Sequence, residues 1–202
     1  MRLNTLVKSL IVLICHIETL SGLTSYDNFP DDWLEIQETP IQIETQIINN
    51  FPYCRANGVF NFPSKQIITL LDNQIEYPNV FERIKITRML SDTTVYVRLD
   101  LPFPFNDRDY IVNYHYEKND NIEYFYYNAT NNHDISLVDK CVRLTNTSGI
   151  WMIESINQNQ TKLTYVWQGE LMGDFPEWAL ETAWIEQANE VFTSINNFLS
   201  NK

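Results

Sequence analysis

The chain is poor in glycine, histidine and positive charge. Its 202 residues include 5 glycines, 3 histidines and 14 lysines and arginines, against 26 aspartates and glutamates, for a formal net charge of -12. Nucleic-acid phosphates require a basic face, so this balance argues against a nucleic-acid partner. It also argues against tight docking on anionic membranes, so any contact with a bilayer must use apolar side chains.

Catalytic and metal-binding motifs are missing as well. The sequence contains no glycine-rich phosphate loop, no Gly-x-Ser-x-Gly elbow, no His-Glu-x-x-His and no Cys-x-x-Cys. After residue 22 the only histidines are His115 and His133, which excludes a histidine-rich metal site. We therefore expect no catalytic residues, no cofactor and no metal.

The first 22 residues have the pattern of a secretory signal peptide. The basic start Met1-Arg2 precedes an apolar run at residues 9–17, and the small residues Ser21-Gly22 follow. The run is shorter than the roughly 20 residues that a membrane-spanning helix needs, so we expect cleavage after Ser21 or Gly22 and export of one domain, residues 23–202. The destination is a periplasm or the outside of the cell. An N-terminal core helix and, through Cys15, a lipid anchor are the alternatives.

Hydrophobic periodicity predicts a sheet that precedes one long helix. Alternation at period two predicts a strand at residues 41–47, with 54–61 as its hairpin partner. Helices are expected at residues 26–37, 63–71 and 77–83. Further strand-like segments, joined mostly by short polar turns, predict an antiparallel meander over residues 84–90, 94–101, 109–117, 122–128, 137–145, 149–156 and 162–169.

Residues 176–199 carry the longest apolar stripe at helical spacing. The stripe consists of Trp184, Ile185, Ala188, Val191, Phe192, Ile195, Phe198 and Leu199. A curved sheet with such a helix across its open side encloses either a packed core or a tunnel, and periodicity does not distinguish the two.

Residues 101–110, Leu-Pro-Phe-Pro-Phe-Asn-Asp-Arg-Asp-Tyr, make an unusual corner between two predicted strands. The two prolines keep the segment extended and outside a continuous ladder, and Asn106-Asp107 supplies turn chemistry. Arg108 and Asp109 place opposite charges where the next strand begins. We therefore expect a structural turn with a local ion pair.

This corner resembles the proline-proline-Asn-Arg-Asp-aromatic signature of START domains, the lipid-transfer modules named after steroidogenic acute regulatory protein. Here Asp107 separates Asn106 from Arg108. Further matches follow in the family's order at residues 141–143, 149–154, 161–165 and 173–178, and the whole match covers about residues 33–199. The resemblance implies an α+β helix-grip fold, in which a curved antiparallel β-sheet wraps around a long C-terminal α-helix and encloses a hydrophobic tunnel. It also puts Cys54 and Cys141 on strands that are not neighbours, so two buried thiols are expected.

The strand at residues 110–117 places Tyr110, Val112, Tyr114 and Tyr116 on one face, which we take to face inward. Inward tyrosines make apolar walls with hydroxyl tips, which suits an amphipathic ligand, although ordinary core packing gives the same pattern. Our predicted ligand contacts are Tyr96, Arg98, Val112, Tyr114, Tyr116, Trp184 and Phe192.

Arg98 has two interpretations. If the apolar residues of its strand are buried, Arg98 and Asp100 face solvent. In several START domains an acid stands at the position that resembles Arg98 and an arginine at that of Tyr114, so Arg98 is alternatively a lone cavity cation that a ligand oxygen satisfies. The chain also departs from the family's usual Trp-Asp at Val80-Phe81.

The function that the resemblance implies is that of an exported, monomeric START-like carrier, not an enzyme. It would bind and transfer a lipid or sterol-like ligand through transient membrane contact. Trp178, Trp184 and Phe192 lie on the closing helix, with Gly173 and Pro176 at its hinge, so the helix is either a lid or a permanently packed element beside a loop that opens. The first alternative is a helix-grip cyclase or hydrolase acting on a hydrophobic small molecule. That enzyme would need an acid-base pair among His115, Arg98 and the inward tyrosines. His115 alternates with the inward residues of its strand, however, and is therefore expected to point outward. The second alternative is an adaptor whose tunnel is filled by side chains.

Overall fold

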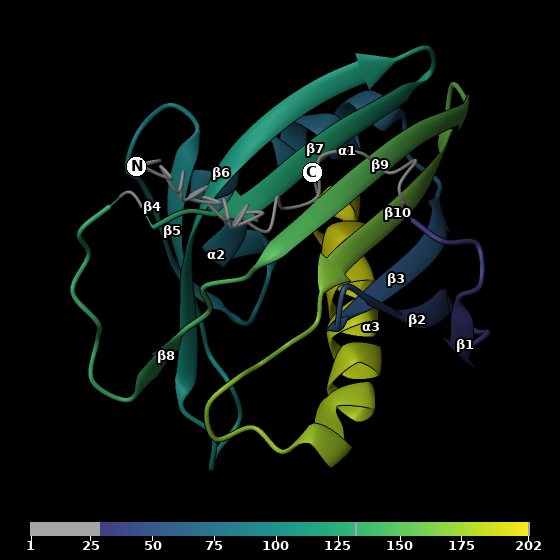
Figure 1. Cartoon of the computed structure of the whole chain (residues 1–202). Coiled ribbons are helices and arrows are strands. Elements are labelled where there is room, and N and C mark those ends of the chain that lie inside the picture. The colour runs from purple at the N-terminus through teal and green to yellow at the C-terminus, as the bar shows by residue number, and fades with distance from the viewer. Residues whose placement is uncertain (1–28, 132, 202) are drawn as a thin grey trace, which may run out of the picture.

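The computed structural model describes residues 29–131 and 133–201 as a curved sheet with helices on its inner side (Figure 1). The strands are β1 (Leu34–Gln37), β2 (Gln42–Ile48), β3 (Phe51–Phe60), β4 (Ile84–Met89), β5 (Thr94–Leu99), β6 (Asp107–Asn119), β7 (Ile122–Ala129), β8 (Cys141–Arg143), β9 (Ser148–Asn157) and β10 (Gln160–Gln168). The α-helices are α1 (Ser64–Leu71), α2 (Tyr77–Val80) and α3 (Leu180–Ser200), with 3-10 turns at Gln74–Glu76 and Glu177–Ala179. The predicted signal peptide, residues 1–22, lies outside the described residues. Among the helices of the described part, none has the length and hydropathy of a membrane span.

The main sheet runs in the order β1-β2-β3-β10-β9-β7-β6-β5-β4, with antiparallel neighbours throughout. The N-terminal hairpin joins the last strand of the meander, because β3 pairs with β10. Strands β1 and β4 therefore form two separate edges, and the sheet is not closed. This confirms the predicted α+β architecture of a curved antiparallel sheet with a long C-terminal helix.

Strand β8 departs from the predicted meander. Of the expected strand at residues 137–145, only Cys141–Arg143 is regular, and it pairs parallel with Asp107–Asp109 of β6. Strand β7 pairs with β6 only from Val112 onward, so the first residues of β6 have a free edge there. The β8 segment occupies that edge, where Arg143 donates to the buried carboxylate of Asp109 at 2.6 and 2.9 Å.

The helix predicted at residues 26–37 is wrong over its described part. Leu34–Gln37 instead forms β1, an antiparallel partner of β2. Trp33 and Ile36 of this segment lie on opposite faces of the sheet, which an extended chain permits. Trp33 packs on the outer face beneath the guanidinium of Arg55, 4.3 Å from its ring centroid, whereas Ile36 packs against the inner core.

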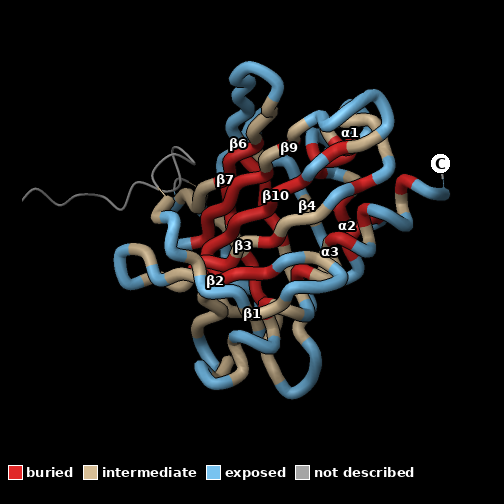
Figure 2. Tube along the Cα trace, turned by 90° about the vertical axis from the view of Figure 1, so that its right-hand side faces the viewer, coloured by how far each residue is buried: buried red, intermediate tan, exposed pale blue. Residues whose placement is uncertain are grey.

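Helix α3 carries the predicted apolar stripe along one side of the sheet, where Figure 2 also places α1 and α2. Its buried residues are Trp184, Ala188, Phe192, Ile195 and Leu199. Phe192 stacks on Phe60 with ring centroids 5.5 Å apart. It lies so close to Gly58 that a Cβ there would be 2.7 Å from the ring, so strand β3 needs a glycine for the helix to approach.

Arg108 ties the corner to the loop before α3, and its side chain is fully buried. Its Nε donates to the carbonyl of Leu171 at 2.5 Å, and its two Nη atoms donate to the carbonyls of Asn106 (2.6 Å) and Met172 (2.9 Å). Its Nη2 also donates to the carboxylate of Asp174 at 3.0 Å. The structural role predicted for the corner is confirmed. The local ion pair is wrong, because both charges find partners more than 30 residues away.

Replacing Arg108 by leucine should lower the free energy of unfolding by about 3 kcal/mol or more, because four backbone carbonyls lose a fully buried donor. Urea denaturation measures the effect. The control is Lys118→Met, which removes an exposed pair with Glu123 and should change the free energy of unfolding by less than about 1 kcal/mol. Equal effects of the two substitutions would contradict the role assigned to Arg108.

Candidate functional site

An apolar pocket of about 340 Å³ lies between the inner face of the sheet and α3. We call it the inner pocket. Its deep wall comes from α2, β6, β7, β9 and β10, and it is lined by Tyr77, Phe81, Tyr110, Tyr114, Tyr127, Leu144, Thr147, Trp151, Tyr165, Trp167 and Gln168. Its volume falls in the range of small-molecule sites, which are mostly apolar with few polar groups.

The side of helix α3 that faces this pocket carries mainly small and polar residues. The helix residues that line it include Ala183, Glu186, Gln187 and Val191. The larger apolar side chains of the helix pack elsewhere in the core. The pocket therefore exists because the helix residues above it are too small or too polar to fill it.

The tyrosines of the deep wall are in contact with one another. The hydroxyls of Tyr127 and Tyr165 are 2.7 Å apart and hydrogen-bonded, and the rings of Tyr114 and Tyr127 lie 5.7 Å apart. The ring of Tyr165 stacks between Trp151, at 3.6 Å, and Trp167, at 4.6 Å. Burial raises the pKa of each of these three tyrosines above its ordinary value, so all three stay neutral at physiological pH.

A glycine makes room for this arrangement. Tyr127, Gly149 and Trp167 form one row across β7, β9 and β10. A Cβ on Gly149 would lie 2.3 Å from the hydroxyl oxygen of Tyr127, so the phenol lies over the glycine. Any larger residue at Gly149 would displace the Tyr127 hydroxyl from Tyr165.

The charged residues of the inner pocket lie towards its mouth. Its lining there includes Glu82, Arg83, Asp100, Glu170, Glu186 and Glu190. Arg83 donates two hydrogen bonds to Glu190, both at 2.5 Å, and Lys85 pairs with Asp100 at 2.6 Å. The remaining carboxylates make the mouth acidic.

The structure separates the predicted ligand contacts on β5 and β6. Tyr114 lines the inner pocket, and Val112 is fully buried in the inner core beside it without lining the pocket. Tyr96 and Arg98 lie on the opposite face, because they alternate along β5 with Val95, Val97 and the pocket-lining Leu99. Tyr96 and Arg98 therefore do not line the inner pocket, and their contact with a ligand remains a prediction.

Arg98 is not a lone cation. Its guanidinium pairs with Asp107 at 2.6 Å and its side chain is 23% exposed, which agrees with the first of its two interpretations. Tyr96 is buried and donates its hydroxyl to Asp109 at 3.1 Å. Both residues hold the start of β6 in place from outside the inner pocket.

Three more predicted contacts lie outside the inner pocket. Trp184 donates its indole N–H to the carbonyl of Gly169 at 2.8 Å, and Phe192 packs on β3 as described above. Tyr116 is 46% exposed and donates to Glu123 at 2.6 Å, because the far end of β6 extends beyond the helices. Whether any of the three touches a ligand remains a prediction.

The cysteines and the histidine are far from a catalytic arrangement. Cys54 and Cys141 are both free thiols, as predicted, but only Cys54 is buried as expected, whereas Cys141 is partly exposed. Desolvation raises the pKa of each. His115 is exposed on the outer face, also as predicted, with its ring 6.2 Å from that of Tyr126. No group of three or more potential metal ligands occurs in the described residues.

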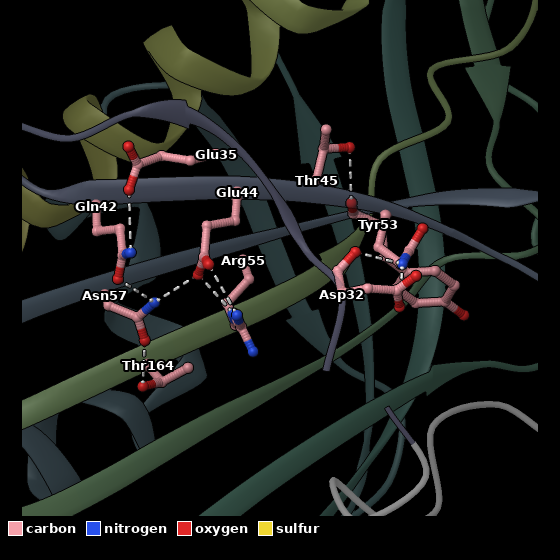
Figure 3. A network of polar contacts seen from close by, with 10 residues as sticks. Asp32, Glu35, Gln42, Glu44, Thr45, Tyr53, Arg55, Asn57 and Thr164 are labelled. Atoms are coloured by element: carbon pink, nitrogen blue, oxygen red, sulfur yellow. Dashed lines mark hydrogen bonds and ion pairs between the residues drawn. The ribbon is translucent and has the colours of Figure 1, made fainter. Parts of the chain in front are cut away.

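A second concavity, of about 450 Å³, lies on the outer face over β2, β3, β9 and β10. Figure 3 shows its polar network, in which the carboxylate of Glu44 accepts from Arg55 at 2.7 and 2.9 Å and from Asn57 at 3.1 Å. The hydroxyl of Thr164 donates to Asn57 at 2.7 Å. These side chains satisfy one another, so the network holds the hairpin on the sheet and leaves the inner pocket as the candidate site.

Solved structures of known proteins share this architecture at low sequence identity. A STAR-related lipid transfer protein from Xanthomonas axonopodis is similar over 84% of this chain and 99% of its own, with a TM-score of 0.72 and 16% identity. Human StAR-related lipid transfer protein 5 is similar over 85% of this chain and 88% of its own, with a TM-score of 0.73 and 10% identity. Human STARD10 is similar over 84% of this chain and 74% of its own, with a TM-score of 0.72 and 12% identity.

The chain has the START fold. This confirms the resemblance carried by residues 101–110 and by the later motifs, as far as the fold is concerned. No protein-family model matches the sequence, and no curated protein matches it either.

Several residues of the deep wall of the inner pocket were not predicted from the sequence. Trp151, Tyr165 and Trp167 line the inner pocket but were not among the predicted contacts. Their strands bury both faces, since Ile150 and Val166 are also fully buried on the outer side. Alternation then carries no signal of which face holds a pocket. The one indication in the sequence was the aromatic pair Tyr165 and Trp167, two positions apart on one strand, which places both rings on the same face.

The neutral tyrosines predict a sharp loss of stability at alkaline pH. An unfolded tyrosine ionises near pH 10, whereas burial raises the pKa of Tyr110, Tyr114, Tyr127 and Tyr165 in the folded state. Their contribution is therefore complete below about pH 10 and declines as the pH rises above it. Urea midpoints from about pH 9 to about pH 12 should fall, and tyrosinate absorbance should appear together with unfolding. Ionisation of these phenols near pH 10 in a protein that remains folded would contradict their burial.

Proposed function

We propose that this chain binds a lipid or another hydrophobic ligand in the inner pocket and carries it between membranes. The observation that supports this most is the apolar, largely aromatic pocket between the sheet and α3. The printed names of the similar structures, which describe lipid-transfer proteins, add support from the fold. The predicted hydrophobic tunnel would be this pocket in a form extended around its ligand.

Hydrocarbon burial would supply the affinity. Each methylene removed from water contributes roughly 0.8 kcal/mol, so about twelve methylenes contribute roughly 10 kcal/mol before the cost of association. Few polar contacts are then needed, and they serve to select the ligand.

Membrane contact would occur at the mouth of the inner pocket. Two large aromatic side chains near it are almost fully exposed, Phe103 in the corner (97%) and Trp178 before α3 (86%). Trp178 also lines the pocket, and the hydrogen bonds from Arg108 hold the corner and the loop before α3 together. Exposed aromatic residues at an opening favour the interface of a bilayer, and apolar insertion suits a chain of net charge -12.

A carrier fits the inner pocket better than a helix-grip enzyme does. One similar structure is the di-domain aromatase/cyclase BexL, with a TM-score of 0.50 and 10% identity over 73% of this chain and 46% of its own. The acid-base pair that an enzyme needs is not assembled from the candidates, because His115 and Arg98 both lie on the outer face. The described lining of the inner pocket contains no histidine. We therefore propose a carrier without catalytic activity.

Filling the inner pocket tests this function. Ala183→Trp adds a large side chain at the pocket-lining side of α3 and should abolish uptake of fluorescent sterol, fatty acid and phospholipid analogues by the purified protein. Thr193→Trp, at an exposed position of the same helix that does not line the pocket, is the matched control and should bind normally. Native mass spectrometry of the unsubstituted domain should show a co-purified lipid. A folded Ala183→Trp protein that still binds every probe would refute the site.

We also propose export, from the signal-like residues 1–22. Expression of the full chain in a secreting host should release a protein whose N-terminus, by sequencing, is Gly22 or Leu23. Replacing the apolar residues Leu10 and Leu13 by lysine should block the release, because the apolar run would be interrupted. Retention of Met1 in the released protein would contradict the proposed cleavage.

A further inference from the structure

The geometry points to a neutral hydrogen-bond donor site at the deep end of the inner pocket, which selects an uncharged ligand that carries an oxygen acceptor and excludes an anionic one. This inference rests on the proposed function. It adds the chemistry of the ligand's polar end, which neither the fold nor the similar structures determine.

The first observation is an indole N–H without a partner. Trp167 is 3% exposed and lines the inner pocket, and its Nε1 is buried with no hydrogen-bond partner among the described residues. An indole nitrogen only donates, so the missing partner must be an acceptor. Burying such a group without a partner is costly, which favours a site that a ligand or a water molecule completes.

The neighbouring hydroxyls provide further donors. The hydroxyl of Tyr110, which also lines the pocket, is kept neutral by burial and therefore carries a proton that it can donate. Tyr127 and Tyr165 each have one hydroxyl proton, but the hydrogen bond between them uses only one of the two. The other proton is available for donation to a ligand. Tyr127 lies over Gly149, next to Trp167 in the same cross-strand row. Tyr110 is close enough to interact electrostatically with Tyr127 and Tyr165, so these donors belong to one region of the wall.

Charge excludes an anionic ligand from this region. Among the described residues that line the inner pocket, Arg83 is the only cation, and both of its hydrogen bonds to Glu190 are short and bidentate. The unpaired carboxylates at the mouth repel an approaching anion. A carboxylate or phosphate placed among neutral phenols and an indole would lose its hydration without gaining a counter-charge.

The polar end of the ligand is therefore an alcohol, ester or ketone oxygen on an apolar body. Such an oxygen accepts from Trp167 and Tyr110, and a hydroxyl can also donate in return to a phenol oxygen. A neutral hydrogen bond has a modest net value, which corresponds to about a fivefold change in affinity for each donor.

Three fluorescent probes test this inference. They share one long hydrocarbon chain and end in a methyl group, an alcohol or a carboxylate. The alcohol should bind the unsubstituted protein at least about tenfold more tightly than the carboxylate. Trp167→Phe, which keeps the aromatic ring and removes the N–H, should weaken binding of the alcohol about fivefold and leave the methyl-terminated probe unchanged.

Trp33→Phe is the matched control. The indole N–H of Trp33 is also buried without a partner, but it packs on the outer face with Arg55, so its loss should affect no probe. If Trp167→Phe does not fold, Tyr110→Phe tests the same site. It should also weaken binding of the alcohol and leave binding of the methyl-terminated probe unchanged.

The outcomes separate this inference from the proposed function. If Trp167→Phe weakens the methyl and alcohol probes equally, the indole contributes only packing and the donor site is refuted. Tighter binding of the carboxylate than of the alcohol would also refute it, while the carrier function would stand. If no probe binds the unsubstituted protein, the proposed function fails together with the inference.

Discussion

One buried guanidinium holds together the segments that surround the mouth of the inner pocket. Arg108 joins the corner before β6 to the loop that leads into α3, and its donors are satisfied by four carbonyls and one carboxylate. A charge with no exposed surface is stable only when such partners are complete, so the two segments must stay together for the group to remain buried. This contact fixes the loop that leads into α3 against the corner at residues 101–110.

The inner face of the sheet combines two demands that usually conflict. It must pack densely against a helix to stabilise the fold, and it must leave space for a ligand. The chain meets both because α3 has two different sides. One side is a large apolar stripe with Trp184 and Phe192 that packs on β3 and β10. The other side carries small and polar residues and lies over the tyrosines. Glycines at positions 58 and 149 give the aromatic rings their room.

The candidate site was predictable only in part. The inward direction of Tyr110 and Tyr114 followed from alternation along a strand with one wet face, and both line the pocket. The same alternation put Tyr116 inward, but β6 continues beyond the helices, and no local pattern reveals where a covering layer ends. Arg98 could not be assigned from its own strand, because its partner Asp107 belongs to the next one.

By itself the sequence determined the α+β class, the structural corner at residues 101–110 and, apart from residues 137–145, the approximate strand and helix segments from residue 41 onward. These are local properties, since period, proline placement and turn residues act within a few positions. Only the tertiary structure decided which charges pair, that Leu34–Gln37 is a strand, and that an aromatic wall with an unpartnered indole lies beneath α3. Those outcomes depend on contacts between residues far apart in the chain, where packing and the satisfaction of buried polar groups override local preference.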